Sequence, residues 1–492
     1  SAEQDYNYFL GLFDLFWQKN QANYETLTFW SRVPAVALTL MLGVLVFVYA
    51  RRLFGPRAAV FAVFLYTVEP TVLAHGRVVQ TDIPSAFSYL LFSLVLYEYL
   101  LAPTLRRAGL VGAAVGLAVV TKFSMVVLGP VLVLVAVMLF LSASRWNLSR
   151  GQVAAQAAVI ALACLLTVHA AYFFHNRTPE PYDFSLTEAG LPQSVDAALR
   201  PLMPYAHAAL HRVFPSDFVS GIGWQLGHNK WGHPAGLLGE HRVLGWWYYF
   251  PVAFALKTTL PFLLLSLASV AWAAWMYFAR GRESKYLALL VPLAFFTGLV
   301  MLSKINIGVR YFLPAYMFMF VAGGALLDWL LRNFRPRGAA LALAAAALCW
   351  TGLEAARAFP DYMAYMNQLA SERPRWYYLS DSNVEWGDDI REMALYLKAR
   401  GEKRVGAALL GGQVLARYGI DGTGIFVPPG ETPEETRYVA VGASFLNGST
   451  VPGGFEGFPL DERTRVNYFD EYRRRTPEKV FGNSIYLYRM KE

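Results

Sequence analysis

Ten long apolar runs constrain the fold of this chain more than any other feature of its sequence. Each run is about long enough to cross a bilayer, for which an α-helix needs roughly 20 residues. Inside a bilayer every backbone polar group must be satisfied internally, and a helix does this within one segment. The runs are 33–50, 58–74, 83–101, 108–122, 124–142, 152–174, 257–279, 286–303, 311–331 and 338–358. The sequence therefore predicts an α-helical polytopic membrane protein.

The composition supports this class. Of the 492 residues, 56% are hydrophobic and only 16% are charged, against roughly 25% charged in an average soluble domain. The net charge of +8 does not indicate a nucleic-acid partner, because basic residues in a membrane protein first indicate cytoplasmic loops. Cys164 and Cys349 lie inside apolar runs, so we predict neither a disulfide framework nor a thiolate metal site.

The loops between the runs alternate in charge. One set holds 13 basic residues in five loops: Arg51, Arg52, Arg57, Arg106, Arg107, Arg145, Arg150, Arg280, Arg282, Lys285, Arg332, Arg335 and Arg337. The positive-inside rule assigns this set to the cytoplasm. The opposite set, which includes a long loop at 175–256 and the tail 359–492, is then predicted to face outward. We expect a multi-pass protein of the inner (cytoplasmic) membrane with a periplasmic or extracellular C-terminal domain.

Three regions follow from this topology. Residues 1–32 are too polar to span, and we predict an interfacial segment on the outer face; simple packing on a neighbouring helix explains the pattern equally well. Residues 33–358 form the transmembrane domain. In the tail, short apolar runs at 405–410, 438–441 and 484–488 alternate with a helical stretch near 388–400 and Gly/Pro-rich turns. That pattern predicts a small α/β domain over 359–492.

The stretch 73–84 joins two spans and carries Arg77 and Asp82. Charges at a membrane boundary are costly unless they face water, a partner or a ligand. The same face carries Lys122, Lys257, Lys304 and Arg310. One cation at a helix end can snorkel to the headgroups, and a solvated turn is the ordinary alternative. The outward-facing loops of a membrane protein normally carry few basic residues, so several cations there favour a bound anion. Phosphate suits both Arg and Lys.

An acid beside a phosphate site indicates group transfer. The carboxylate would deprotonate an acceptor hydroxyl, and the cations would stabilise a phosphate leaving group. We therefore predict a lipid-linked phosphosugar as donor, and the residues do not specify any other cofactor. A transporter could carry the same charges, but the sequence has no inverted repeat and no acid near the membrane midplane.

Three other clusters leave alternatives open. His228, His233 and His241 lie close in sequence, but their spacing matches no zinc pattern, so a divalent metal is unsupported. The aromatic run 246–250 suits an interfacial belt or a sugar-stacking platform. The acidic stretch 381–389 either caps a helix or binds a ligand.

Several stretches together resemble a known family. They are 29–32, 51–55, 73–84, 116–124, 245–261, 304–314 and 361–389. Their order along the chain resembles the GT-C superfamily of membrane glycosyltransferases, and is similar to bacterial protein O-mannosyltransferases and lipid A aminoarabinose transferases. The resemblance implies transfer of a sugar from a polyprenyl-phosphate-linked donor to a protein, lipid or glycan acceptor on the outer face.

The resemblance also implies roles for individual residues. Asp82 would act at the reaction centre, and Arg77 would orient it or touch the donor. Lys304, Arg310 and Lys257 would contact the donor phosphate. The candidate acceptor or sugar contacts are His75, Trp247, Tyr248, Asp381, Asn383, Glu385 and Trp386.

One element of the family pattern is not in this sequence. Family members begin with a transmembrane helix and an acidic first outer loop that supplies the main catalytic base. We expect this helix and loop upstream of Ser1, which would make eleven spans. The alternative is a catalytically inactive, GT-C-like subunit of a larger membrane complex that binds lipid or partner proteins.

Overall fold

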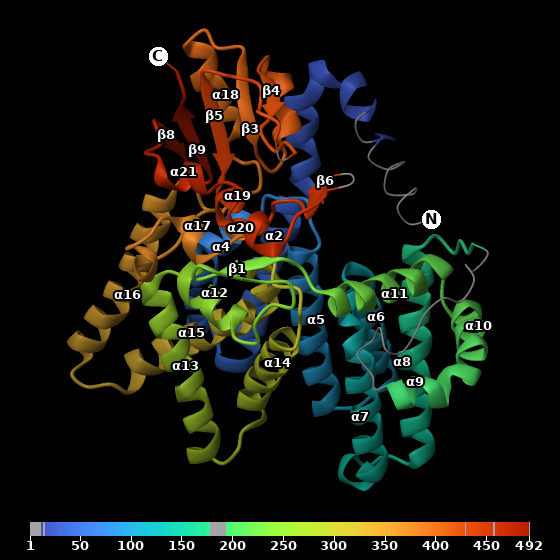
Figure 1. Ribbon diagram of the computed structural model, residues 1–492. Helices are drawn as coiled ribbons and strands as arrows, with labels where there is room; N and C mark the ends of the chain where they lie inside the picture. The colour runs from blue at the N-terminus through green and yellow to red at the C-terminus, as the bar shows by residue number, and fades with distance from the viewer. Residues whose placement is uncertain (1–10, 13–14, 178–192, 429, 456–457, 492) are drawn as a thin grey trace.

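A computed structural model describes residues 11–12, 15–177, 193–428, 430–455 and 458–491. A layer of long helices carries a small mixed α/β domain at one end (Figure 1). Eight of the described helices are long and apolar enough to cross a membrane by length and composition, so the chain is a multi-pass membrane protein. Their bounds are Gln21–Phe54, Asp82–Leu101, Phe123–Leu141, Arg150–Ala171, Leu260–Ala279, Ser284–Met301, Val309–Asn333 and Arg337–Ala358.

All ten predicted runs contain helix, but two of them fall short of these criteria. Helix α6 (Leu105–Thr121) has 17 residues. The run 58–74 is broken into α3 (Pro56–Thr67) and the short α4 (Pro70–His75). The break has a local cause, since Pro70 cannot continue the helix and disfavours helical backbone at Glu69. Glu69 is accordingly extended, with φ −83° and ψ 119°.

The first long helix begins earlier than the sequence indicates. Helix α2 runs over Tyr24–Phe54, whereas the apolar run begins at 33. Its 31 residues correspond to about 46 Å at 1.5 Å per residue, which exceeds the roughly 30 Å hydrocarbon core. The N-terminal end of α2 therefore projects beside the tail domain (Figure 1). Residues 1–10 and 13–14 of the predicted interfacial segment lie outside the described residues.

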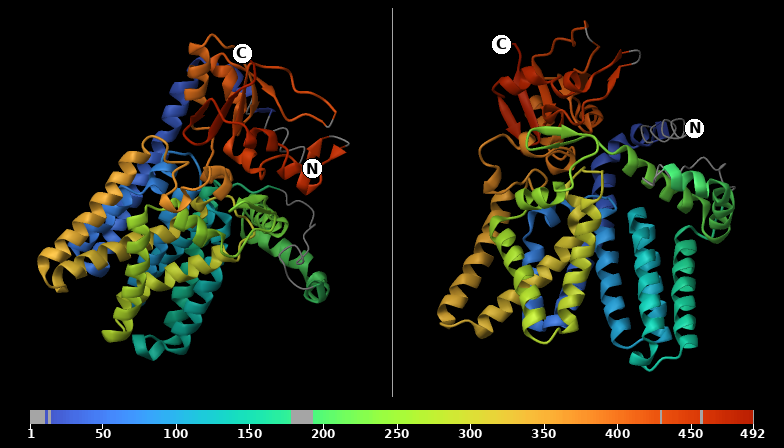
Figure 2. Two further views of the ribbon diagram at one scale, coloured as in Figure 1. Left: turned by 60° about the vertical axis from the view of Figure 1, so that its left-hand side comes forward. Right: turned by 60° about the horizontal axis from the view of Figure 1, so that its bottom comes forward.

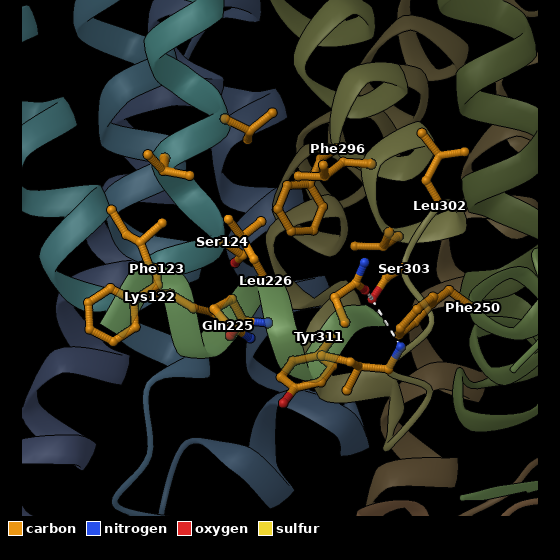
Figure 3. A pocket seen from close by; sticks show the side chains of 17 residues that line it. Lys122, Phe123, Ser124, Gln225, Leu226, Phe250, Phe296, Leu302, Ser303 and Tyr311 are labelled. Atoms are coloured by element: carbon orange, nitrogen blue, oxygen red, sulfur yellow. Dashed lines mark hydrogen bonds between the residues drawn. The ribbon is translucent and has the colours of Figure 1, made fainter. Parts of the chain in front are cut away.

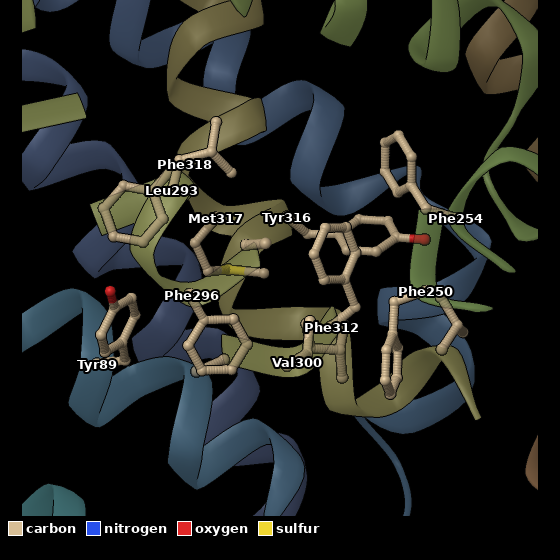
Figure 4. Close-up of a cluster of buried hydrophobic side chains, with 14 of the residues drawn as sticks. Tyr89, Phe250, Phe254, Leu293, Phe296, Val300, Phe312, Tyr316, Met317 and Phe318 are labelled. Carbon is tan, nitrogen blue, oxygen red and sulfur yellow. The ribbon is translucent and has the colours of Figure 1, made fainter. Parts of the chain in front are cut away.

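Helix α15 (Leu313–Asn333) lies at the centre of the membrane domain. Of the most apolar 18-residue stretch of this helix, 83% is buried inside the protein. Gly324 allows close packing on α3, because a Cβ there would meet the backbone at Ala58 and Ala62. Aromatic side chains from α5 (Asp82–Leu101), α12 (Tyr249–Lys257), α14 (Ser284–Met301) and the start of α15 fill the space between these helices (Figure 4). The ring centroids of Tyr89 and Phe296, for example, are 5.0 Å apart.

The remaining membrane helices are η2 (Phe123–Val127) with α7 (Leu128–Leu141), α8 (Arg150–Ala171), α13 (Leu260–Ala279) and α16 (Arg337–Ala358). The turns α7–α8 and α13–α14 lie at the end of the helix layer away from the tail domain (Figure 1). These turns belong to the basic set of loops, so the two predicted sets lie at opposite ends of the layer.

The long loop between α8 and α13 contains structure that the sequence pattern did not predict. Its described part holds α9 (Gln193–Leu199), α10 (Met203–Val213), α11 (Ser216–Trp231), the hairpin β1 (Ala235–Leu237) and β2 (Glu240–Arg242), and α12. Residues 178–192 of the loop lie outside the described residues. Figure 2 shows the green helices of this loop projecting from the side of the helix layer.

The tail contains the predicted small α/β domain. Its five-stranded sheet has the order β4-β3-β5-β9-β8. Strand β3 (Arg404–Ala408) pairs in parallel with β4 (Asp421–Gly424) and β5 (Tyr438–Gly442). Strand β9 (Ile485–Arg489) is antiparallel to β5 and to β8 (Lys479–Phe481). Helix α18 (Ile390–Ala399) buries Ile390, Met393, Ala394 and Leu397 in the same core as residues of this sheet.

Candidate functional site

Asp82 is the centre of a buried ionic cluster at the end of the membrane domain near the tail. It is the first residue of α5, and its side chain is 1% exposed. Its Oδ1 accepts a hydrogen bond from Lys122 Nζ at 2.7 Å, and its Oδ2 lies 3.5 Å from Arg310 Nη1. The side chains of Lys122 and Arg310 are 16% and 12% exposed. A buried carboxylate needs such partners, because desolvation of an unpaired charge is expensive.

Arg310 makes two further contacts around Asp82. Its Nη1 donates to Gln80 Oε1 at 2.9 Å, and its Cζ lies 4.2 Å from the centre of the Trp386 ring. Its Nε is buried without a hydrogen-bond partner among the residues that the structure describes. The Gln80 amide also lies 3.0 Å from Nδ1 of the buried His75. The predicted site residues His75, Asp82, Arg310 and Trp386 therefore form one connected group.

The segment before Arg310 is held by the tail. Gly308 has φ 142°, and a Cβ at this position would clash with Ser382. Ser382 Oγ donates to the carbonyl of Ile307 at 2.5 Å, and Val309 N donates to Asn383 Oδ1 at 2.9 Å. Both polar groups come from the 3₁₀ helix η7 (Asp381–Asn383). The tail thus fixes the backbone that positions Arg310 in η5 (Val309–Phe312).

Asn383 and Lys257 are buried in one hydrogen-bond network. Asn383 Nδ2 donates to Tyr249 Oη at 2.9 Å. Lys257 Nζ donates to the carbonyls of Asn383 and Met363, at 2.5 Å each. Lys257 is 2% exposed, so in this structure its amino group joins α12 to the tail backbone.

Glu385 joins the same segment to the tail sheet. Its carboxylate accepts hydrogen bonds from Leu410 N at 2.9 Å and from Ser444 N at 3.0 Å. These donors follow the carboxyl ends of β3 and β5. Burial raises the pKa of Glu385 to about 8, although the two backbone N–H groups lower it. Asp381 has a positive φ of 55° and accepts a hydrogen bond from Ser382 N at 2.6 Å.

The other predicted residues lie outside this group. Arg77 donates to Asp388 Oδ2 of the tail at 2.9 Å, so its ion-pair partner is not Asp82. Lys304 is half-buried, and its backbone N donates to Asn229 Oδ1 at 3.0 Å. Trp247 is 66% exposed and makes an edge contact with Tyr248.

Sequence reasoning assigned no site role to Lys122, Gln80 or Asp388. Lys122 is one of the cations in the loops that were predicted to face outward, and that signal could have placed it in the site. Gln80 carries no charge, so nothing in the sequence distinguishes it. The partner of Asp388 comes from 311 residues away, and no local pattern reveals such a pair.

An apolar cavity of about 280 Å³ opens beside Lys122 (Figure 3). Lys122 and Tyr311 line one part of it, and Lys122 Nζ lies 3.6 Å from the centre of the Tyr311 ring. The rest of the lining comes mainly from η2, α11 and α14. The side chains there include Phe123, Leu226, Phe296, Leu299 and Val300. The cavity therefore combines a hydrophobic interior with a cation from the Asp82 cluster.

The histidines of the outer loop do not form a metal centre. Nε2 of His228 lies 3.4 Å from Nδ1 of His233, whereas His241 Nε2 lies 2.5 Å from the carbonyl oxygen of Asn447. Burial lowers the pKa of each of these imidazoles. Among the described residues, no group of three or more His, Cys, Asp or Glu side chains is arranged to hold a metal ion.

Comparison with known proteins gives a family match for part of the chain. Residues 26–170 match the family model of dolichyl-phosphate-mannose-protein mannosyltransferases. The resemblance to membrane glycosyltransferases is thereby confirmed over this part, which includes Asp82 and Lys122. No curated protein sequence matches the chain.

Solved structures similar to the chain include an archaeal oligosaccharyltransferase and the bacterial protein ArnT. The oligosaccharyltransferase of Archaeoglobus fulgidus is 15% identical with a TM-score of 0.43, over 85% of this chain and 56% of that one. ArnT from Cupriavidus metallidurans, bound to undecaprenyl phosphate, is 17% identical with a TM-score of 0.41, over 79% of this chain and 60% of that one. The chain thus covers less than two thirds of either protein.

Proposed function

We propose that the protein is a membrane glycosyltransferase that moves a sugar from a polyprenyl-phosphate-linked donor to an acceptor on the outer face of the membrane. The observation that carries this proposal is the pairing of Asp82 with Lys122 and Arg310 beside an apolar cavity. A lipid phosphate needs both an apolar site for its chain and cations for its head. The match of 26–170 to a dolichyl-phosphate-mannose transferase family supports the same donor class.

In this proposal the first isoprene units enter the apolar cavity, and the phosphate reaches Lys122 and Arg310. The bond between the anomeric carbon and the phosphate oxygen breaks, and its electron pair stays on the phosphate. Two cations held in a site of low dielectric stabilise that charge. Asp82 keeps both cations in position, because each of its oxygens engages one of them.

The acceptor hydroxyl forms the new bond to the anomeric carbon and gives its proton to a carboxylate base. We predict that this base belongs to the acidic first outer loop that the family resemblance implies. Lys304 stays a candidate phosphate contact. The buried network around Lys257 supports a structural role for that residue instead.

The orientation of the protein is part of the proposal. The basic loops and the tail domain lie at opposite ends of the helix layer (Figure 1). The positive-inside rule then supports a cytoplasmic position for the loops and an outer position for Asp82, Arg310 and the tail. We propose the inner membrane as the location.

The test is binding and turnover of the donor by the purified full chain in nanodiscs. R310A should weaken binding of undecaprenyl phosphate by about tenfold or more, because a charge-assisted contact is worth roughly 1.5–3 kcal/mol. D82N should lower the release of sugar from an undecaprenyl-phosphate sugar. R280A changes an exposed arginine at the opposite end of the helix layer and is the matched control.

The outcomes separate the competing readings. Full binding and full sugar release in both R310A and D82N would remove the site assignment. Binding that depends on Arg310, without sugar release from the parent chain, would favour the non-catalytic lipid-binding subunit.

A further inference from the structure

A second cavity, of about 410 Å³, lies between the membrane domain and the tail. Its walls come from the projecting end of α2, from the loop 77–79 and from the tail segments 386–391 and 411–418. It lies within the range of roughly 300–1,000 Å³ that is typical of small-molecule sites. Unlike the cavity beside Lys122, it is lined mainly by polar and aromatic groups.

The position of this cavity in the fold is typical of a ligand site. Gly411 and Val414 line it and follow the carboxyl end of β3, the central parallel strand of the tail sheet. Ligands of open α/β sheets bind outside the carboxyl ends of the strands. Trp386 also lines the cavity and stacks on Arg310. One side chain therefore connects this cavity to the proposed donor phosphate site.

The chemistry of the lining suits hydroxyl groups better than a formal charge. Two ion pairs line the cavity, Arg77–Asp388 at 2.9 Å and Arg391–Glu25 at 3.2 Å. The two charges of each pair cancel. The planar guanidinium and carboxylate groups can still bind two neighbouring hydroxyl groups at once. Among the described residues that line the cavity, only Arg32 adds a charge outside these pairs.

Aromatic rings supply the complementary apolar surface. Trp386 and Tyr418 line the cavity, and aromatic rings combine a large apolar face with a polar edge. An extended peptide would instead seek an open strand edge. Strand β3, whose carboxyl end leads to the lining residue Gly411, has no open edge, because it pairs with β4 on one side and β5 on the other.

We propose that this cavity is the acceptor site of the enzyme and that it takes a neutral carbohydrate. The inference rests on the proposed transferase function for its role, but the binding of a carbohydrate can be measured without the donor. The tail domain then selects the acceptor, and the membrane domain holds the donor. Trp386 lies at the boundary between the two sites.

The experiment is saturation-transfer NMR on the purified full chain in nanodiscs. The probes are glucose, galactose, mannose and N-acetylglucosamine, and a neutral peptide containing Ser and Thr. R391Q replaces a guanidinium group by a neutral amide, and Y418A removes an aromatic ring from the lining of the cavity. R404Q is the matched control for R391Q, because Arg404 lies on the same domain in exposed ion pairs with Asp421 and Glu434.

The parent chain should bind at least one of the sugars, and R391Q and Y418A should each weaken binding by about tenfold. R404Q should bind like the parent. If Y418A is poorly folded, Y418L keeps a branched apolar side chain at the position while it removes the ring, and the same loss is expected. Binding of the peptide alone, binding of no probe, or equal binding by R391Q and R404Q would overturn the proposal.

Binding of undecaprenyl phosphate in the same samples separates this proposal from the donor assignment. A chain that binds the lipid phosphate but none of the sugars overturns only the acceptor site. A chain that binds a sugar through Arg391 but does not bind the lipid phosphate supports the carbohydrate site and overturns the proposed donor.

Discussion

The guanidinium carbon of Arg310 lies 4.2 Å from the centre of the Trp386 ring. The two residues come from different domains, so the tail covers a cation that we assign to the donor phosphate. A guanidinium held against an aromatic face keeps its charge while it loses rotational freedom. The tail is therefore a structural part of the membrane site.

Replacing Trp386 should weaken the binding of the lipid phosphate. A desolvated cation–π contact is worth up to about 2 kcal/mol, so W386L should lower the affinity for undecaprenyl phosphate by about tenfold or more. W386F keeps a ring and should lose less. Native mass spectrometry of the lipid complex measures both. W247L changes an exposed tryptophan and is the control; equal affinity in W386L and W247L would contradict the role of the stack.

Asn383 should act as a positioning residue for Arg310. In N383A, the buried N–H of Val309 loses its acceptor and Tyr249 Oη loses its donor. An unsatisfied buried group costs about 1–3 kcal/mol, so both the melting temperature and the lipid-phosphate affinity should fall. N383D keeps the acceptor for Val309 N.

The two variants separate stability from positioning. We expect N383D to lose melting temperature but to retain more of the affinity for lipid phosphate than N383A. If the two variants lost affinity equally at equal melting temperature, the hydrogen bond to Val309 would have no role in positioning Arg310.

Glu385 should make stability fall as the pH rises. Its pKa is raised from 4.5 to about 8, mainly by burial, so the folded chain holds a proton that the unfolded chain releases. The stabilisation of the folded chain by this proton is complete below the pKa of the unfolded chain. It is lost as the pH rises from 4.5 toward 8, and the free energy of unfolding then falls by at most about 1.4 kcal/mol per pH unit. Asp389, whose pKa burial raises to about 6, adds the same sign at lower pH.

The measurement is the melting temperature across this pH window for the parent, E385Q and D389N. E385Q cannot ionise, so its curve should be flatter than that of the parent between pH 6 and 8. D389N should flatten only the part below about pH 6. A parent curve that rises through the window, or that matches E385Q, would exclude this role of Glu385.

Filling the apolar cavity should act on the lipid chain and spare the charged head. Leu226 lines the cavity, and L226W would occupy much of it. We expect weaker binding both of undecaprenyl phosphate and of a short-chain prenyl phosphate, because each places its first isoprene units in this cavity, but little change in the binding of inorganic phosphate. L210W, at an exposed position on α10, is the control. Full binding of both lipids by L226W would place the chain elsewhere.

The sequence predicts the membrane helices well because lipid imposes a simple rule on composition. The sequence pattern singled out Asp82 as a charge at a membrane boundary, and Arg310 as a cation in the loops that were predicted to face outward. Lys122 carried the same signal but had no assigned role. The order of the spans and the charge of the loops selected these residues as candidates, and the family resemblance supplied the roles proposed for them.

The rest depends on contacts between segments far apart in the chain. The backbone before Arg310 is set by Ser382 and Asn383, which lie 74 to 75 residues away. The start of α2 is polar, yet it is helical where Tyr24 and Glu25 contact the tail at Tyr418 and Arg391. Hydrophobic periodicity contains no information about such pairings, and it also missed the helices of mixed polarity in the outer loop.

The length of α2 links the bilayer to the acceptor side of the molecule. The helix is continuous from the membrane to Glu25 at the polar cavity. A helix that is mismatched with the local bilayer thickness responds by tilting, and the tilt of so long a helix moves its far end most. Acyl-chain length should therefore alter the distance between Glu25 and Arg391. Bilayer thickness should then change the width of the cavity that we propose for the acceptor.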